Sequence, residues 1–405
     1  MIDWRAALLV ALLAAGSPVR AQSTDAADVP SVLRPAVTAY RSGDLASAEA
    51  GLRPLATGNP DARAWLGAVL IDRGQARDGL RAIQGAADAG SIEGFHRLGL
   101  VHALGLAGQA RNEAKAVELF EKAANAGNQR AQVNLGILYL RGQGVPRDLV
   151  TARAWLEKAA AGGEPQAMYT LGRALDESSD QVPGDPVRAA DLYRRAAEKG
   201  HALAGLRYGL ALTEGFGVKR DVPTGQRWLV QAQENGLPEA ALALGDQIAR
   251  TPASRDKAAN ERTVQTAVSW YDVAAKGGVP SAQFKLANAY FAGVGIGRDP
   301  AQAEYWYGRA AAQGLPQAQH ALGIMVMGGI NGAADPVQGY KWLLLAEKAG
   351  HPDARAVRAK SADRLSEKDR RQAEALAQKY KPTLERPIDD AAVLRPVTAV
   401  PPAGR

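Results

Sequence analysis

Large apolar residues recur along the chain, most of them with a small residue four positions earlier. Ala131 precedes Leu135 and Ala282 precedes Leu286, and a spacing of four puts both members of such a pair on one helical face. A glycine follows the large residue in most copies, where the missing Cβ lets a neighbouring backbone come close. The copies are Leu66-Gly67, Leu98-Gly99, Leu135-Gly136, Leu171-Gly172, Tyr208-Gly209, Leu244-Gly245, Leu286-Ala287 and Leu322-Gly323. We therefore expect one helix of about 12 to 14 residues in each of these segments.

A second series of glycines closes each segment and sets the period. Successive members lie 36 or 37 residues apart, with one interval of 42 residues. The members are Gly90, Gly127, Gly163, Gly200, Gly236, Gly278, Gly314 and Gly350. Glycine adopts the left-handed conformation without steric cost, so each of these residues is expected to end a helix. The period is typical of proteins built from two-helix repeats.

A third series marks a second helix in each unit. A large residue lies eight positions before the closing glycine, and five of the seven tryptophans of the chain occupy this position. These residues are Leu119, Trp155, Leu192, Trp228, Trp270, Trp306 and Trp342. We interpret them as packing anchors rather than as a stacking surface for sugars or bases, with Tyr271 and Tyr307 as partly exposed exceptions.

An acidic residue lies seven positions before the large residue in most units. Its carboxylate can accept the free N–H groups at the start of the second helix, so we expect it to be the N-cap. The residues concerned are Asp148, Asp185, Asp221, Asp299 and Asp335. Paired acids of a hydrolase are the less economical interpretation, because successive aspartates are separated by a whole repeat.

The combined pattern resembles the Sel-1-like repeat, a relative of the tetratricopeptide repeat. Residues 131–163 and 282–314 match its motif nearly throughout, and the resemblance covers about 60–350. It implies an all-α protein, a right-handed α-solenoid of about eight two-helix repeats. Members of the family mostly bind other proteins and assemble complexes.

The solenoid is expected to span residues 61–352, with different elements on both sides. Residues 22–60 are similar to one more tetratricopeptide-like hairpin, and 353–380 are expected to form a helix that covers the last repeat. Residues 381–405 contain five prolines and few large apolar side chains, which predicts a disordered tail. Within the long 42-residue unit we expect 253–260 to form an extended loop.

Residues 1–21 have the features of an export signal. Arg5 precedes an apolar run at 6–15, and Val19-Arg20-Ala21 is a small-x-small cleavage site before Gln22. The apolar run is too short to span a bilayer, and no later stretch is long enough either. We therefore expect a periplasmic or secreted protein without a membrane span in its mature chain.

The composition gives no sign of catalysis, of a cofactor or of a metal site. There is no cysteine, and no histidine pair has the spacing of a helical zinc site; His96 and His320 are expected to be half-buried structural residues. The net charge of +7 contains no Lys/Arg run, so nucleic acid is not an expected partner. The prediction is a non-catalytic chain.

The position two residues before each repeat glycine varies between copies while its neighbours stay fixed. We take such a position to be solvent-facing, and the resemblance places it on a concave groove. The candidate partner-binding residues are Arg97, Asn134, Thr170, Arg207 and Lys285. A solvated helix face without any ligand is an equally ordinary interpretation.

These observations predict an exported scaffold that binds a protein partner through the concave face of a solenoid. The alternative is a glycan-binding or exopolysaccharide-export scaffold, in which exposed Tyr and Arg residues would contact the polysaccharide.

Overall fold

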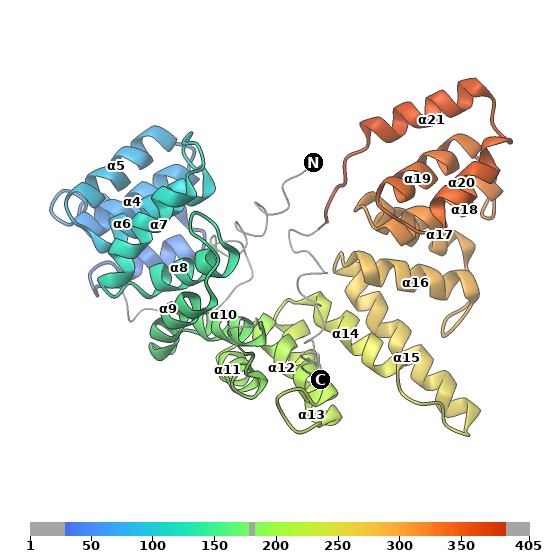
Figure 1. Cartoon of the computed structure of the whole chain (residues 1–405), viewed down its shortest axis with the longest axis horizontal. Coiled ribbons are helices and arrows are strands. Elements are labelled where there is room, and N and C mark those ends of the chain that lie inside the picture. The colour runs from blue at the N-terminus through green and yellow to red at the C-terminus, as the bar shows by residue number, and fades with distance from the viewer. Residues whose placement is uncertain (1–28, 178–182, 386–405) are drawn as a thin grey trace. The chain divides into compact units, whose positions relative to one another are not determined.

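The protein is described by a computed structural model that covers residues 29–177 and 183–385. The predicted signal segment and residues 386–405 of the predicted tail lie outside the described residues. Every regular element within the described ranges is an α-helix (Figure 1). The chain divides into unit 1, which ends at Asp221, and unit 2, which begins at Val222.

Unit 1 is a stack of helical hairpins. Its helices are α2 (Arg34–Arg41), α3 (Leu45–Leu52), α4 (Pro60–Asp72), α5 (Ala76–Asp88), α6 (Ile92–Leu104), α7 (Glu113–Asn125), α8 (Gln129–Arg141), α9 (Leu149–Ala161), α10 (Pro165–Asp176), α11 (Pro186–Glu198) and α12 (Ala202–Glu214). Each helix packs on the next one along the chain, and first helices also meet across repeats, as α4 meets α6 and α8 meets α10. This is the α-solenoid arrangement that the sequence predicts.

Unit 2 repeats the arrangement and ends with a different pair of helices. Its helices are α13 (Val222–Glu234), α14 (Pro238–Ala249), α15 (Lys257–Lys276), α16 (Pro280–Ala292), α17 (Pro300–Ala312), α18 (Pro316–Gly328), α19 (Pro336–Lys348), α20 (Ala354–Ala362) and α21 (Glu367–Lys379). The expected capping helix at 353–380 is therefore two helices, both packed on α19. Leu365, between the two helices, and Ala373 of α21 join the core around Tyr340 and Leu343.

The repeat glycines lie where first and second helices of a hairpin touch. A Cβ added to Gly136 would lie 2.6 Å from Leu156 Cγ, and one added to Gly172 would lie 2.6 Å from Tyr193 Cε1. Because real Cβ atoms do not approach so closely, only glycine fits there without moving the partner. The contact explains why the large apolar residue is followed by glycine.

The side chain that fills this contact lies one residue later than the sequence suggested. Leu156, Tyr193 and Leu229, each seven positions before the closing glycine, are fully or almost fully buried. One position earlier, the predicted packing anchors divide into two groups. Leu119, Leu192 and Trp306 are buried as expected. The half-buried members are Trp155, Trp228, Trp270 and Trp342. The expectation that Tyr271 and Tyr307 are partly exposed was wrong: both rings are buried in the core of unit 2.

The helix ends follow the predicted caps. Asp148, Asp185, Asp299 and Asp335 each accept a backbone N–H of the first turn that they precede. All eight closing glycines have positive φ, from 79° to 96°. Local side-chain and backbone chemistry therefore fixes both ends of most second helices.

The long unit departs from the expected loop at 253–260. Helix α15 begins at Lys257, capped by Asp256, and is 20 residues long where most helices have 12 or 13. Half of the expected loop is thus the first turn of a lengthened helix. Its sequence Lys-Ala-Ala-Asn is compatible with a helix once an N-cap precedes it.

Candidate partner-binding surface

Four of the five candidate residues are buried, so the expectation that their position faces solvent was wrong. Arg97, Asn134, Thr170 and Arg207 are each at most 8% exposed. Lys285 is the exception, with 37% of its side chain exposed. Arg97, Asn134 and Lys285 contact residues of the repeat before them. Thr170 bonds within its own helix.

Arg97 illustrates these contacts in unit 1. Its guanidinium lies 3.7 Å from the ring centroid of Trp65, and its Nε donates to Glu93 Oε1 at 2.8 Å. The Arg97 charge contributes to a lowered pKa of Glu93, against the effect of burial. Arg97 therefore forms a structural cation–π and ion-pair contact.

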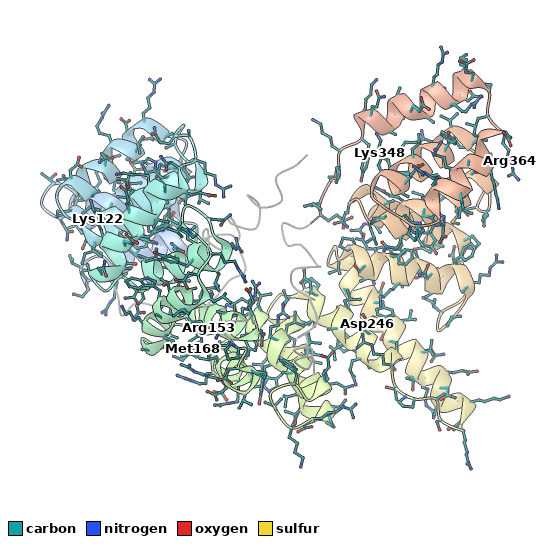
Figure 2. All side chains as sticks on the ribbon, viewed as in Figure 1. Lys122, Arg153, Met168, Asp246, Lys348 and Arg364 are labelled. Atoms are coloured by element: carbon teal, nitrogen blue, oxygen red, sulfur yellow. The ribbon has the colours of Figure 1, made fainter. Side chains whose placement is uncertain are left out.

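The other candidates have equally specific neighbours. Asn134 Nδ2 lies 3.3 Å from His96 Nε2 of the previous repeat, and Thr170 Oγ1 donates to the Gln166 carbonyl at 2.8 Å. Lys285 Nζ donates to Asp246 Oδ1 at 2.5 Å; Asp246 lies on α14, as Figure 2 shows.

Arg207 lies near a second half-buried acid, Asp176. Burial raises the pKa of Asp176, and the hydrogen bond from Tyr193 and the charge of Arg207 act in the opposite direction. The contacts of Arg97, Asn134 and Lys285 join successive first helices, so mutating the candidate partner-binding residues would test stability as much as binding.

A surface that the sequence did not reveal lies where one repeat ends and the next begins. Gln132, Gln283 and Gln319 each follow the small alanine of a first helix. Their Nε2 atoms donate to the carbonyls of Ala124, Ala275 and Ala311 at 3.1–3.2 Å. Since terminal helical carbonyls lack intrahelical partners, this glutamine tightens the turn between repeats.

In unit 2 an extended segment of the chain lies on this surface. Tyr380 Oη is within hydrogen-bond distance of the Ala311 and Ala312 carbonyls, and Thr383 N donates to Ala312 O at 2.9 Å. Glu385 lies against Gln283 and Arg309. The expected disorder of residues 381–405 is therefore contradicted for 381–385, which have no helical periodicity that could have indicated their position.

We call the four residues Gln283, Trp306, Arg309 and Gln313 the turn edge of unit 2. Gln132, Trp155, Lys158 and Gly162 occupy the same repeat positions and form the turn edge of unit 1. In both edges the cation lies over the tryptophan three residues before it, at 4.9 Å for Arg309 and 4.2 Å for Lys158. The signal for these edges in the sequence is the recurrence of Gln, Trp and a cation at fixed distances from the closing glycine.

Histidines mark two other junctions between repeats. His201 is the N-cap of α12 and stacks on Tyr169 with ring centroids 4.7 Å apart. Burial lowers the pKa of His201 to about 4. His351 stacks on His320 at 4.1 Å, and burial followed by the His351 charge lowers the pKa of His320. His96 is more deeply buried than expected, and His320 is half-buried as expected.

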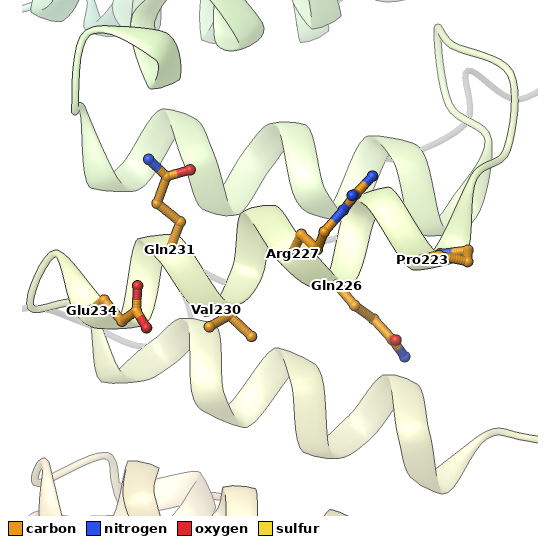
Figure 3. A pocket seen from close by; sticks show the side chains of 6 residues that line it. All are labelled: Pro223, Gln226, Arg227, Val230, Gln231 and Glu234. Carbon is orange, nitrogen blue, oxygen red and sulfur yellow. The ribbon is translucent and has the colours of Figure 1, made fainter.

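An open hollow of about 780 Å³ follows α13 between Pro223 and Glu234, with Gln226, Arg227, Val230 and Gln231 along it (Figure 3). Its lining side chains come from one helix. No group of three or more His, Asp or Glu residues within 29–177 and 183–385 is placed to hold a metal ion. No helix of the described chain has the length and apolar character needed to cross a membrane.

Several known proteins are similar to this chain. Chitin synthase regulator SKT5 of Saccharomyces cerevisiae is 32% identical over 226 residues, which are 53% of this chain and 32% of that protein. The Arabidopsis thaliana ERAD-associated E3 ubiquitin-protein ligase component HRD3B is 34% identical over 106 residues, 26% of this chain and 16% of that protein. The chain thus spans a third or less of these curated relatives.

Two crystal structures share the fold over most of the chain. A protective antigen of uropathogenic Escherichia coli with an SLR fold has a TM-score of 0.60 and 26% identity, covering 91% of this chain and 80% of its own. A Sel1 repeat protein from Oxalobacter formigenes has a TM-score of 0.57 and 30% identity, covering 76% and 88%. The Sel1 repeat model matches residues 96–128, 129–164, 165–201, 203–237, 280–315 and 316–351, more than half of the sequence. The chain belongs to the Sel1 repeat family.

Proposed function

We propose that the protein is an exported, non-catalytic scaffold that binds a partner protein through its repeats. One observation carries the proposal: the repeats of unit 2 hold an extended peptide, residues 380–385, through the ends of three helices. A surface that binds a segment of its own chain by backbone and side-chain hydrogen bonds can bind a similar segment of another protein.

The relatives support a role as a scaffold. SKT5 is by name a regulator of chitin synthase, and HRD3B is by name a component of a ubiquitin ligase. Both names describe a protein that acts on or with another protein. We extend this general role, and not the particular partners, to the present chain.

Export is the second part of the proposal and rests on residues 1–21. If the signal is cleaved, intact-mass analysis of the protein purified from its natural host will give a chain that begins at Gln22. A chain that retains Met1 would contradict export by this route.

The glycan alternative loses part of its basis. It relied on exposed aromatic residues, and Tyr271 and Tyr307 are buried, with their hydroxyls donating to Asp246 and Asn288. Among the aromatic residues near the turn edge, Tyr305 is exposed at 54% and lies against Arg309.

Site-specific crosslinking in the living cell tests the proposal. A photoreactive benzoylphenylalanine at Tyr305 should give a crosslinked product with one predominant protein, which mass spectrometry identifies. The control is the same group at Val187, an exposed residue of α11 in unit 1. Absence of any protein adduct at both positions would contradict the scaffold.

A further inference from the structure

The turn edge of unit 2 is built to hold a carboxylate. Arg309 Nε donates to one oxygen of Glu385 at 2.9 Å, and its Nη2 contacts the other oxygen. Gln283 Nε2 donates to this second oxygen at 3.0 Å. Two parallel guanidinium bonds and one amide bond match the geometry of a carboxylate, which is stronger and more specific than a contact with a neutral group.

The amides that take part are fixed before a ligand arrives. Gln283 is fully buried and also donates to the Ala275 carbonyl. Gln313 Nε2 donates to Gly278 O and to Gln283 Oε1, at 3.2 and 2.9 Å. Gln313 Oε1 accepts the backbone N–H of Glu385 at 3.1 Å. The network thus hydrogen-bonds both the carboxylate and the extended backbone that carries it. Because the amides are already held in place, binding costs little side-chain conformational entropy.

A second contact of the segment, made by Tyr380, lies five residues before Glu385. The Tyr380 hydroxyl is 2.9 Å from Ala311 O and 3.1 Å from Ala312 O at the end of α17. These carbonyls belong to the last turn of a helix, where a donor from outside is accepted readily. Between Tyr380 and Glu385, Thr383 N donates to Ala312 O at 2.9 Å.

The segment is an imperfect occupant. Leu384, between Tyr380 and Glu385, is 58% exposed. Gln319 Nε2 reaches Tyr380, but the buried Gln319 Oε1 has no hydrogen-bond partner within the described part of the chain. Both charged side chains of the Arg309–Glu385 pair keep more than a quarter of their surface in water. A partly exposed ion pair stabilises weakly, so the segment can leave.

From this geometry we propose that the turn edge of unit 2 binds an extended segment of the partner protein with a glutamate five residues after a tyrosine. The chain's own Tyr380–Glu385 occupies this site until the partner's segment displaces it. The inference rests on the proposed function and specifies the chemistry of the partner. A short connection to α21 gives the internal segment an effective concentration on the order of millimolar, so it acts as a built-in competitor.

Peptide binding to the full chain tests the inference. The probe is a fluorescein-labelled peptide Tyr-Lys-Pro-Thr-Leu-Glu with blocked ends, followed by fluorescence polarisation. The double variant Thr383→Pro/Glu385→Gln loses a backbone donor and the charge of the internal segment. We expect it to bind the peptide at least five times more tightly than the unsubstituted chain. Equal affinity of the two chains, or no binding to either, would overturn the inference.

Two further substitutions in the double variant locate the site. Arg309→Ala should weaken peptide binding at least tenfold, whereas Lys158→Ala, at the matching position of unit 1, should leave it unchanged. A peptide that ends in Gln in place of Glu should lose affinity to a similar extent. Equal effects of Arg309→Ala and Lys158→Ala would show non-specific charge attraction and overturn the site.

Hydrogen exchange provides a measurement that does not depend on the peptide. The Thr383 amide should exchange slowly in the unsubstituted chain and at least ten times faster in Arg309→Ala, with the circular dichroism unchanged. If Thr383 exchanges equally fast in both, the segment is not seated. A partner adduct at position 305 together with failed peptide binding would leave the scaffold standing and remove only this inference.

Discussion

The two turn edges share a glutamine and a tryptophan at matching repeat positions and differ in the contacts that these edges make. In unit 2, Gln283 Oε1 accepts from Gln313, and Arg309 holds Glu385. In unit 1, Gln132 Oε1 has no hydrogen-bond partner among the described residues, and Lys158 is exposed over Trp155. The glutamine is therefore part of the repeat itself, whereas carboxylate binding depends on the neighbours that only unit 2 supplies.

Two of the four positions differ between the edges. Lysine replaces arginine and removes the planar fork that holds both carboxylate oxygens. Gly162 replaces Gln313, and the side chain of Gln129 fills the space where a Cβ at Gly162 would lie. The edges therefore differ at two of the positions whose side chains bond Glu385 in unit 2.

The largest expected effect tests whether both edges rest on the same core. Leu156→Ala removes a fully buried side chain beneath the edge of unit 1 and should lower the free energy of unfolding by about 2–5 kcal/mol. Trp155→Ala, at the half-buried neighbouring position, should cost less. Urea unfolding followed by circular dichroism measures both. A larger loss of unfolding free energy for Trp155→Ala would show that the tryptophan is the main packing residue of this helix. The two edges would then not rest on equivalent cores.

The second-largest expected effect is a loss of stability at low pH, caused by the buried histidine His201 between repeats. The pKa of His201 is about 4 in the folded chain, below its ordinary value of 6.5. A lowered pKa means that the unfolded chain binds the proton first, so this stability is complete above pH 6.5 and is lost as pH falls towards 4. His201→Asn keeps an N-cap acceptor and should flatten the decline of melting temperature in this range. An unchanged slope would show that other groups dominate, including those around His320 in unit 2.

Removing the shared glutamine should then separate the two edges. Gln283→Met breaks bonds to Ala275, Gln313 and Glu385 and should cost about 1–3 kcal/mol. Gln132→Met breaks one bond and also removes an unpaired buried oxygen, so it should cost less than about 1 kcal/mol. Thermal melts of both variants decide this point, and equal losses would mean that the occupant of unit 2 adds nothing.

The smallest expected effect comes from transferring the binding edge. Lys158→Arg/Gly162→Gln should give unit 1 a weak affinity for the Tyr-Lys-Pro-Thr-Leu-Glu peptide, a few-fold above that of the unsubstituted chain. The gain is limited because Gln129 must move to admit the new side chain. Nuclear magnetic resonance shifts around α9 on adding the peptide would report it, with Lys158→Arg alone as the control.

The repeat itself could be predicted from local rules. Glycines with positive φ, aspartate N-caps and the small–large spacing each have a local physical cause, and the structure confirms them at Gly163, Asp148 and Ala131. Contacts that join one repeat to the previous one could not be predicted from such local rules. Arg97 looked exposed because it varies between copies, yet it is matched to Trp65 on a helix about thirty residues earlier.

The turn edge was missed for a related reason. Gln283, Gln313 and Glu385 are scattered in the sequence, and their role depends on a non-periodic segment that folds back on α17. The position of such a segment follows from hydrogen bonds that it makes with the finished fold. The amino-acid composition of 381–405 as a whole, rich in proline and poor in large apolar residues, pointed towards disorder.

The long helix α15 shows how a repeat of this chain accommodates inserted residues. Gly295, in the loop after α16, packs on Val264 and Val268 in the middle of α15. At the corresponding loop position of other repeats, Gly144 and Gly217 pack on the first residues of α7 and α11. The additional residues of α15 therefore continue past Gly295 by roughly 10 Å, at 1.5 Å per residue. The six surplus residues of the 42-residue interval are absorbed there, so the modules on both sides stay in phase. A tag or fluorophore inserted near Asp256 would lie beyond the packed repeats in the same way, so we expect it to leave the stacking of the repeats unchanged.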